Sequence, residues 1–283
     1  MTSEQDFLLR LQTENAVLVT VQSYRGSVPR EVGAWMAVFA QACMGTIGGG
    51  HLEWNAIEQA RLRLQNQPGE VVLQRYALGS TLGQCCGGEV VLQFESLVGA
   101  DSARLSAGFA KRQAQWPLVA IVGGGHVGQA LVHVLGSLPW QVQWIDSRDE
   151  IFPEQLPGNV QCEHSDPVQQ AIATLTPQSC VLIMSFSHAE DLDVVAACLL
   201  RQRHQADLPF IGLIGSRSKW HSFRHRLVER GFSAQELDVV RCPIGLPGIR
   251  GKEPAVIAVA VAAQLLLEIG CIATTHDKNV RNT

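Results

Sequence analysis

The sequence has no excess of positive charge and no long apolar run. Lysine and arginine number 22 against 26 acidic residues, which gives a formal net charge of −4 at pH 7. Without a global positive field, we expect binding neither to nucleic acid nor to a membrane surface. The longest apolar run, residues 255–263, is too short to span a bilayer. The first residues, MTSEQDFLLRLQTE, carry acids where a secretory signal has a cationic region, so we expect a cytoplasmic protein.

The sequence also lacks the spacings that mark common metal and catalytic sites. Its eight cysteines are irregularly placed, and none forms the C-x₂-C pair typical of structural zinc. With no export signal, such cysteines indicate reduced thiols rather than a disulfide framework. No serine lies in a G-x-S-x-G elbow, and neither a Walker-type phosphate loop nor a pair of catalytic carboxylates stands out. These absences favour a binding protein over an enzyme, and we assign no catalytic residue.

What the chain does have is enough apolar sequence for two domains. Hydrophobic residues make up 46% of its 283 residues and charged residues 17%, a balance typical of globular proteins with large buried cores. A small, polar segment near residue 100 suits a linker. We predict an N-terminal domain at 1–98, a linker at 99–115, a Rossmann-like domain at 116–270 and a flexible tail at 271–283.

The first domain shows strand-like segments around one helical pattern. Strands are predicted at 16–22, 34–40, 71–76 and 89–95, and apolar residues recur at helical spacing over 51–65. Loops rich in glycine and proline separate these segments. The pattern predicts a small α/β domain with a mostly antiparallel sheet.

A glycine-rich segment opens the second domain, VAIVGGGHVGQAL at 119–131. A buried strand runs into a turn with Gly123, Gly125 and Gly128 at the G-x-G-x-x-G spacing, and a helix follows. The first glycine permits a tight turn, the second lets a phosphate approach, and the third lets helix and strand pack closely. The next strand ends at Asp146, where an acid would meet a ribose hydroxyl. This spacing predicts a Rossmann fold and makes NAD(P) a candidate ligand, although such folds also occur without a dinucleotide.

The rest of the second domain alternates short apolar strands with helices. Such alternation predicts a doubly wound parallel sheet. The predicted strands cover 118–122, 141–146, 160–163, 180–185 and 210–214, and the predicted helices cover 126–136, 167–174, 190–203, 218–230 and 254–269.

The most unusual segment of the first domain is GTIGGGHLEW, in which Gly48, Gly49 and Gly50 immediately precede the predicted helix. Their amides could form an anion-binding nest, with His51 and Glu53 beside it in the first helical turn. The alternative is a tight turn that needs only positive φ angles. Because three glycines exceed what a simple turn requires, we favour ligand contact.

Two adjacent cysteines, Cys85 and Cys86, lie in the glycine-rich segment GQCCGG. Adjacent thiols chelate a single zinc ion poorly, whereas a soft partner such as a metal–sulfur centre or a persulfide suits thiolates. The alternative, two ordinary small residues in a loop, carries equal weight.

Two histidines occupy positions from which they could meet a ligand. His126 lies in the glycine-rich turn, and His188 follows a strand and so falls at the carboxyl edge of the sheet, where open α/β sheets bind ligands. His188 could orient or protonate a substrate together with Asp191, or simply cap a helix. Several cations in or next to loops could neutralise an anionic ligand: Arg25, Arg30, Arg217, Lys219 and Arg250.

Six segments taken together resemble the XdhC/CoxI family, accessory proteins for xanthine dehydrogenase and related molybdenum hydroxylases. They run in family order through both domains, from Gly26 to Val261. Where family members often carry Thr-His after the fourth Rossmann strand, this chain has Ser187 and His188. The six segments are GSVPREVGAWM, GTIGGGHLEW, GQCCGGEV, VAIVGGGHVGQAL, FIGLIGSRSKW and PIGLPGIRGKEPAVIAVAV.

The resemblance implies a cytoplasmic protein of purine catabolism that binds molybdenum cofactor, protects it during sulfuration and inserts it into apo xanthine dehydrogenase. The partners implied are the molybdenum subunit of that enzyme and a cysteine desulfurase as sulfur donor, and we expect a homodimer or higher oligomer. The alternatives are an NAD(P)-dependent oxidoreductase with His188 as the acid, and an assembly factor without a ligand. The candidate cofactor contacts are Arg30, Gly48, Gly49, Gly50, His51, Glu53, Cys85, Cys86, Gly123, Gly125, His126, Gly128, Asp146 and His188, with Cys85 or Cys86 near the molybdenum.

Overall fold

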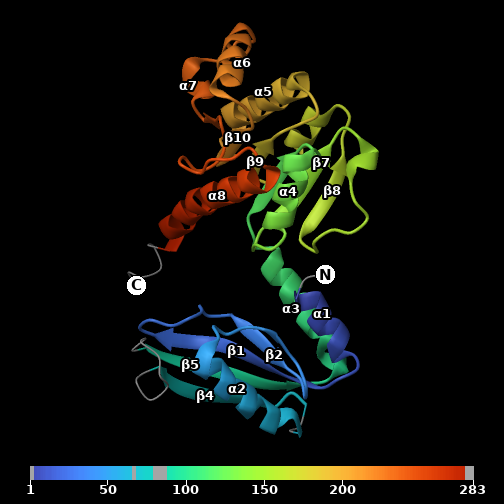
Figure 1. The fold of residues 1–283 in the computed structure, drawn as a ribbon, viewed down its shortest axis with the longest axis vertical. Coiled ribbons are helices and arrows are strands. Elements are labelled where there is room, and N and C mark those ends of the chain that lie inside the picture. Colours follow the sequence, from blue (N-terminus) through green and yellow to red (C-terminus); the bar gives the residue numbers. More distant parts are fainter. Residues whose placement is uncertain (1–2, 66–67, 79–87, 278–283) are drawn as a thin grey trace. The chain divides into compact units, whose positions relative to one another are not determined.

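The computed structural model describes residues 3–65, 68–78 and 88–277. These residues form two compact units, Met1–Lys111 and Arg112–Thr283, which we describe one at a time (Figure 1). Helix α3 (Ser102–Gln113) runs across the division. The segment 99–115 that we expected to be a linker therefore contains the whole of α3.

The first unit is built on a five-stranded sheet in the order β3-β2-β1-β5-β4. All four strand pairs are antiparallel, which confirms the predicted sheet type. The first strand is longer than predicted, and the short third strand was not predicted. The strands are β1 (Ala16–Arg25), β2 (Trp35–Val38), β3 (Cys43–Gly45), β4 (Val71–Leu78) and β5 (Gly88–Leu97).

Helices cover parts of both faces of this sheet. On one face, α2 (Gly50–Leu62) inserts Leu52, Ala56 and Ala60 into a core with the valines of β1. It continues into a 3₁₀ turn, η1 (Arg63–Gln65). On the other face, α1 (Ser3–Leu11) brings Phe7 into a second cluster that also holds Leu105 of α3. A 3₁₀ turn, η3 (Gly99–Asp101), precedes α3.

The second unit is built on a six-stranded sheet in the order β11-β10-β9-β6-β7-β8, and all its pairs are parallel. If the strands β6 to β11 are numbered 1 to 6, their order from β8 to β11 is 3-2-1-4-5-6, which is the order of dinucleotide-binding folds. The predicted doubly wound Rossmann-like domain is therefore confirmed. Its strands are β6 (Leu118–Val122), β7 (Gln141–Asp146), β8 (Val160–His164), β9 (Cys180–Ile183), β10 (Phe210–Leu213) and β11 (Val240–Arg241).

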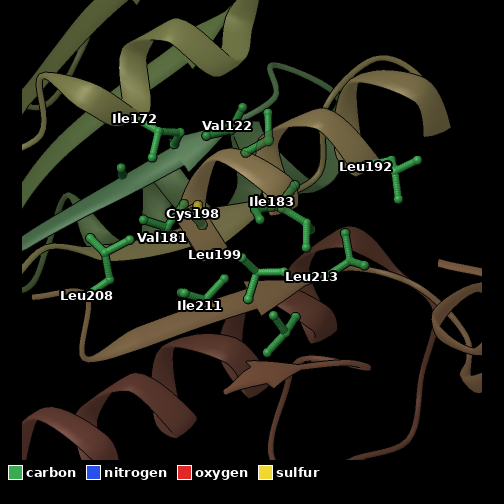
Figure 2. Close-up of a cluster of buried hydrophobic side chains, with 14 of the residues drawn as sticks. Val122, Ile172, Val181, Ile183, Leu192, Cys198, Leu199, Leu208, Ile211 and Leu213 are labelled. Atoms are coloured by element: carbon green, nitrogen blue, oxygen red, sulfur yellow. The ribbon is translucent and has the colours of Figure 1, made fainter. Parts of the chain in front are cut away.

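Helices bury both faces of the parallel sheet, as its nearly continuous Val, Ile and Leu strands require. On one face, α4 (His126–Leu135) and α8 (Pro254–Asp277) lie side by side and share a core (Figure 1). On the other face, α5 (His188–Gln205) and α6 (Arg217–Glu229) pack over β9 and β10. Figure 2 shows part of this second cluster, including Leu192 and Cys198 of α5.

Three smaller elements complete the second unit. They are the 3₁₀ helices η4 (Asp149–Ile151) and η5 (Val168–Ala173) and the short helix α7 (Ala234–Leu237). The helix predicted at 167–174 is thus a 3₁₀ helix, and α8 runs beyond the predicted domain end at residue 270. Within the described residues, no helix is long and apolar enough to cross a membrane.

Candidate functional sites

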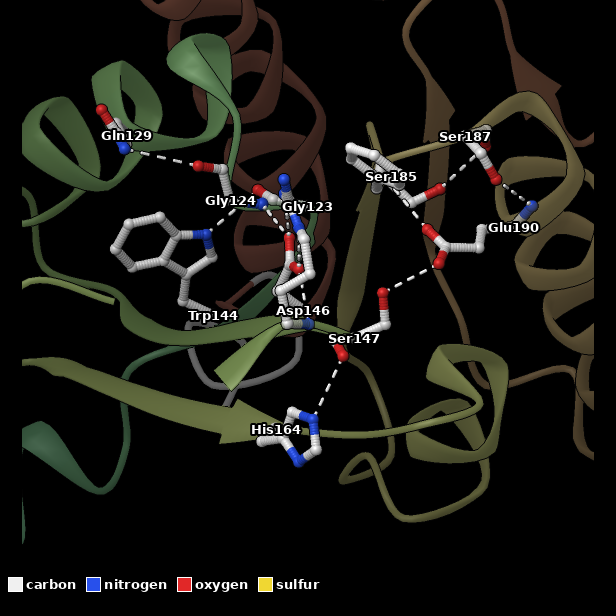
Figure 3. Close-up of polar contacts among 12 residues, drawn as sticks. Gly123, Gly124, Gln129, Trp144, Asp146, Ser147, His164, Ser185, Ser187 and Glu190 are labelled. Atoms are coloured by element: carbon white, nitrogen blue, oxygen red, sulfur yellow. Dashed lines mark hydrogen bonds and ion pairs between the residues drawn. The ribbon is translucent and has the colours of Figure 1, made fainter. Parts of the chain in front are cut away.

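The glycine-rich turn follows β6 at the carboxyl edge of the parallel sheet. A Cβ on Gly123 would collide with the carbonyl oxygen of Met184, and a Cβ on Gly128 would collide with the carbonyl oxygen of Gly123. These two glycines allow the turn, β9 and α4 to pack closely, as the motif predicts. The indole of Trp144 adds a hydrogen bond of 3.0 Å to the same Gly123 carbonyl (Figure 3).

Gly125, the second motif glycine, has a different environment. No atom lies within 4 Å of the position that its Cβ would take, and no side chain caps the helix α4 that begins after it. The first amides of a helix lack intrahelical acceptors and carry the positive end of its dipole. The turn therefore has room for a phosphate at Gly125, with the exposed His126 beside it.

Asp146 at the end of β7 faces the protein interior and is only 1% exposed. Its carboxylate accepts hydrogen bonds from the Gly124 amide at 2.5 Å and the Arg148 amide at 2.9 Å (Figure 3). Two guanidinium nitrogens of Arg148, Nε and Nη2, donate to it at 2.8 and 3.0 Å. Burial alone would raise the pKa of Asp146, but the hydrogen bonds and charge of Arg148 and the Gly124 amide bring that pKa below its usual value.

In this environment Asp146 stabilises the local fold. The carboxylate ties the glycine-rich turn to the end of β7 and holds Arg148, whereas the predicted ribose contact needs an oxygen at the surface. Ile151 of η4 also lies over the turn, because its Cγ1 is 2.5 Å from a Cβ position built on Gly124. Of the two expected dinucleotide contacts, the phosphate contact at Gly125 stays a prediction for which the turn has space, while the acid is turned inward.

The second histidine, His188, begins α5, and Ser187 caps that helix by accepting a hydrogen bond from the Glu190 amide at 3.2 Å. Ser187 therefore retains a capping function. The exposed imidazole of His188 meets the ring of Phe223 edge-on, with centroids 6.3 Å apart. His188 is thus at the carboxyl edge of the sheet, as predicted.

Asp191 does not pair with His188 among the described contacts. It accepts hydrogen bonds from the amide and hydroxyl of Ser185 at 2.8 and 2.7 Å, and it forms an ion pair with Lys219 at 2.5 Å. Lys219 also donates to the Ile214 carbonyl at 2.9 Å. The sequence had suggested Lys219 as a loop cation for an anionic ligand, but its largely buried ammonium group joins the first turn of α5 to the end of β10.

In the first unit, the glycine run before α2 encloses a carboxylate of the chain itself. Oε2 of Glu53 accepts hydrogen bonds from the Thr46 hydroxyl at 2.5 Å and from the amides of Ile47 and Gly49 at 3.0 Å each. Glu53 therefore fills the nest that was expected to receive an anion. An external anion would have to displace it or bind to the first amides of α2.

The conformation of this run accounts for its three glycines. Gly48, Gly49 and Gly50 have φ angles of 122°, 76° and 65°, all in the region that favours glycine. The premise that three glycines exceed what a turn requires was therefore wrong. Gly48 additionally allows close packing, because a Cβ there would lie 2.7 Å from Cγ of Pro29.

Segments that are distant in the sequence meet at this end of the antiparallel sheet. Pro29 and the partly exposed Arg30 lie against Gly48, as the close approach of both side chains to its Cβ position shows. Gly88, at the start of β5, packs on the carbonyl of Ser27, and its Cβ position is 2.8 Å from the carbonyl oxygen of Arg25. The GSVPR segment thus contacts Gly48 of the GTIGGG motif and Gly88 at the start of β5.

Cys85 and Cys86 themselves lie outside the described residues. The described cysteines Cys43, Cys162, Cys180, Cys198 and Cys242 are all free thiols. Burial raises the pKa of Cys180 and of Cys198 to about 12 and that of Cys242 to about 11, which suppresses thiolate formation. Across the described ranges, no group of three or more His, Cys, Asp or Glu side chains is placed to hold a metal ion.

One surface residue beside the nest was not predicted as part of the site. Trp54 is 54% exposed on the first turns of α2, and its indole stacks on the imidazole of His51. The ring centroids are 5.6 Å apart and the planes differ by 24°. The stacking could have been predicted from the segment GTIGGGHLEW, because its final tryptophan follows His51 by three residues and so lies on the same helical face.

Comparison with known proteins agrees with both halves of this architecture. The chain is similar to an uncharacterized protein of Escherichia coli K12, YqeB, at 23% identity over 262 residues, which is 91% of this chain but only 44% of that protein. A crystal structure from Bacillus halodurans, described as a xanthine dehydrogenase, shares the fold with a TM-score of 0.74 over 96% of both chains at 18% identity. The Lactococcus lactis oxidoreductase YlbE aligns with a TM-score of only 0.32, at 16% identity, over 53% of this chain and 84% of its own.

Family models match both units of the chain. Residues 119–265 match the XdhC Rossmann domain, and residues 9–77 match the XdhC and CoxI family. The first of these matches alone covers more than half of the 283 residues. The chain therefore belongs to the XdhC and CoxI family.

Proposed function

We propose that this protein binds molybdenum cofactor as cargo, protects it while its terminal sulfur ligand is installed and inserts it into apo xanthine dehydrogenase. In this role it acts as a carrier in the cytoplasm rather than as an enzyme. Its partners are the molybdenum subunit of the client enzyme and a cysteine desulfurase that supplies the sulfur, and it works as a homodimer or higher oligomer.

The observation that carries this proposal is the meeting of family motifs at one end of the antiparallel sheet. Gly48 lies against Pro29, and Gly88 lies against the carbonyls that precede Pro29, so described residues of three motif segments lie close together. A binding surface explains why these segments are distinctive in sequence while much of the sheet is ordinary. Membership of the XdhC and CoxI family supports the same assignment.

The chemistry of molybdenum cofactor suits this surface. The cofactor is a pterin with a phosphate and a dithiolene-bound molybdenum, so it requires a cation, polar groups and a soft environment near the metal. Arg30 is a partly exposed cation beside the nest. Cys85 and Cys86 immediately precede the Gly87–Gly88 pair in the sequence, and their thiols are the soft ligands we assign to the metal end.

Reconstitution tests the proposal directly. The protein is incubated with released cofactor, free ligand is removed, and molybdenum and oxidised pterin are measured per chain. We expect one of each per chain, and transfer to apo-dehydrogenase should restore its activity. Absence of both molybdenum and pterin would overturn the proposal.

The thiol pair provides a sharper version of the same test. Cys85→Ala, Cys86→Ala and the double variant should lose cofactor retention or protection of the sulfur ligand, while circular dichroism shows an unchanged fold. Cys162→Ala, an exposed thiol on β8, is the matched control and should transfer cofactor normally. Full transfer from all three variants at the pair would exclude a function for these thiols.

A second candidate function is an NAD(P)-dependent oxidoreductase, which the open position at Gly125 and the Rossmann strand order favour. The inward orientation of Asp146 argues against it, because the usual ribose acceptor is engaged by Gly124 and Arg148. We expect neither NADH nor NADPH to be consumed with small carbonyl substrates. Steady turnover that disappears in His188→Ala would support the oxidoreductase instead.

A further inference from the structure

The exposed aromatic pair on α2, His51 and Trp54, has no role in the proposed function as described so far. Trp54 is a large apolar side chain that is more than half exposed, although tryptophan is on average well buried in folded proteins. His51 stacks on it almost in parallel, which holds one side of the indole and fixes its orientation. The remaining indole surface faces solvent as a flat aromatic platform.

The platform rests on a fixed backbone. Glu53 lies between the two aromatic residues in the sequence, and its carboxylate is bonded to the Thr46 hydroxyl and to the amides of Ile47 and Gly49. These contacts attach the first turn of α2 to the preceding loop, while Leu52 is fully buried in the core on the opposite side. A platform held in this way loses little conformational entropy when a ligand stacks on it.

A cation near the start of α2 indicates what kind of ring would bind. Arg30 lies against Gly48, two residues before α2, with its side chain 39% exposed, and its ion pair among the described residues is a 3.7 Å contact to Glu31. A flat heterocycle with an anionic tail suits an aromatic side chain on the first turns of α2 and a cation against the glycine run that precedes this helix. A protein partner would instead be expected to contact a wider apolar surface around the tryptophan.

We propose that His51 and Trp54 form a stacking platform for the pterin ring of the cofactor, with Arg30 directed toward its phosphate. This inference rests on the proposed function and adds to it the residue that recognises the ring. Trp54 becomes the residue that binds the ring, and His51 acts by orienting it. Stacking between an aromatic side chain and a heterocycle is tolerant of ring substituents, so simple pterins should also bind.

Tryptophan fluorescence of the full-length chain gives the test, with neopterin, 6-hydroxymethylpterin and released molybdenum cofactor as probes. We expect the pterins to quench the emission and Trp54→Ala to weaken their binding by about tenfold or more. Trp54→Phe keeps an aromatic face and should bind within about threefold of the original chain. Leu62→Ala, an exposed apolar change at the other end of α2, is the matched control and should leave binding unchanged.

The outcomes separate this inference from the proposed function. Cofactor binding that is unaffected by Trp54→Ala, in a variant with native circular dichroism, overturns the platform and leaves the carrier function intact. Quenching by neopterin and loss in Trp54→Ala, without any retention of molybdenum cofactor, supports the platform and overturns the carrier. If adenosine bound as tightly as the pterins, the platform would be assigned to a nucleoside. If none of the rings bound and Trp54→Ala lost association with the client enzyme, Trp54 would be assigned to a protein interface. Either of these last two results overturns the pterin assignment.

Discussion

Individual glycines of the Rossmann turn have separable functions. Gly125 has an extended backbone, with φ −69° and ψ −178°, and open space at its Cβ position, so Gly125→Val should fold normally. The branched side chain would occupy the space that a phosphate needs and should lower the affinity for any ligand that docks there by more than about tenfold. The measurement is binding of molybdenum cofactor and of NADPH by equilibrium dialysis.

A matched control for this change is Gly128→Val, in which the new Cβ would collide with the Gly123 carbonyl. That variant should be destabilised whether or not a ligand binds. If folded Gly125→Val binds both ligands as the original chain does, the turn serves only to pack α4 against the sheet.

The buried carboxylate of Asp146 should make stability depend on pH. Its pKa is lowered in the folded protein, so its contribution to stability is present above the unfolded value near pH 4 and is lost as the pH falls through the lower folded value. Asp146→Asn should reduce the free energy of unfolding by about 1.5–3 kcal/mol at pH 7, because charged hydrogen bonds to Arg148 are lost. The deficit should shrink toward pH 3.

Urea unfolding at pH 7 and pH 3 measures this difference. Glu154→Gln, a change at an exposed carboxylate in the same unit, should alter stability little at either pH. An equal deficit for Asp146→Asn at both pH values would show that packing, rather than charge, accounts for its effect.

At the scale of elements, the start of α2 and the loop before β2 are joined through Gly48. Gly48→Ala would place a Cβ against the ring of Pro29 at a φ of 122°, and such strain costs on the order of 1–3 kcal/mol. We expect a lower melting temperature of the first unit and weaker retention of cofactor. Gly69→Ala is the control, since Gly69 also has positive φ but no atom within 4 Å of its Cβ position.

Thermal unfolding followed by circular dichroism, with molybdenum retained per chain, distinguishes the two variants. Equal effects of Gly48→Ala and Gly69→Ala on retention would mean that backbone strain alone matters. A selective loss in Gly48→Ala would show that contact between the two loops builds the site.

Short elements are hard to predict from a sequence pattern because they contain few repeats of it. Strand β3 has only three residues, too few periods of its pattern to be recognised. The helix at η5 was predicted, but its six residues are too few to distinguish a 3₁₀ helix from an α-helix by apolar spacing. Helix α3 lies in the segment predicted as a linker because that segment is small and polar, and the structure shows Leu105 as its one buried residue among those described. Its place in the core depends on Phe7, which lies almost a hundred residues earlier in the chain.

At the scale of the whole molecule, each unit has its own hydrophobic clusters. The Rossmann-like unit buries one cluster on each face of its sheet, and the first unit likewise has two. We expect residues 112–283 expressed alone to fold, because a unit of this size can bury a sufficient core. Far-UV circular dichroism and a cooperative urea transition are the measurements, and an unfolded fragment would show that the two units depend on each other for stability.

The sequence by itself determined the class of each unit and located five of the six described strands of the parallel sheet, but not the two-residue β11. These follow from local patterns, since alternating or continuous apolar segments and a glycine-rich turn specify strands and helices within a few residues. It also placed Gly125 and His188 at the carboxyl edge, because that position follows from the chain order of strand and loop. The six ordered motifs sufficed to identify the family.

The tertiary structure alone decided where the polar side chains point. Asp146 faces inward because Arg148 and the Gly124 amide satisfy its carboxylate, and Glu53 fills the nest formed by Ile47 and Gly49. Sequence spacing gives the position of a side chain along an element but not the partner that lowers its free energy. That partner comes from another part of the fold, and only when the backbone brings the two together can a ligand contact be distinguished from an internal one.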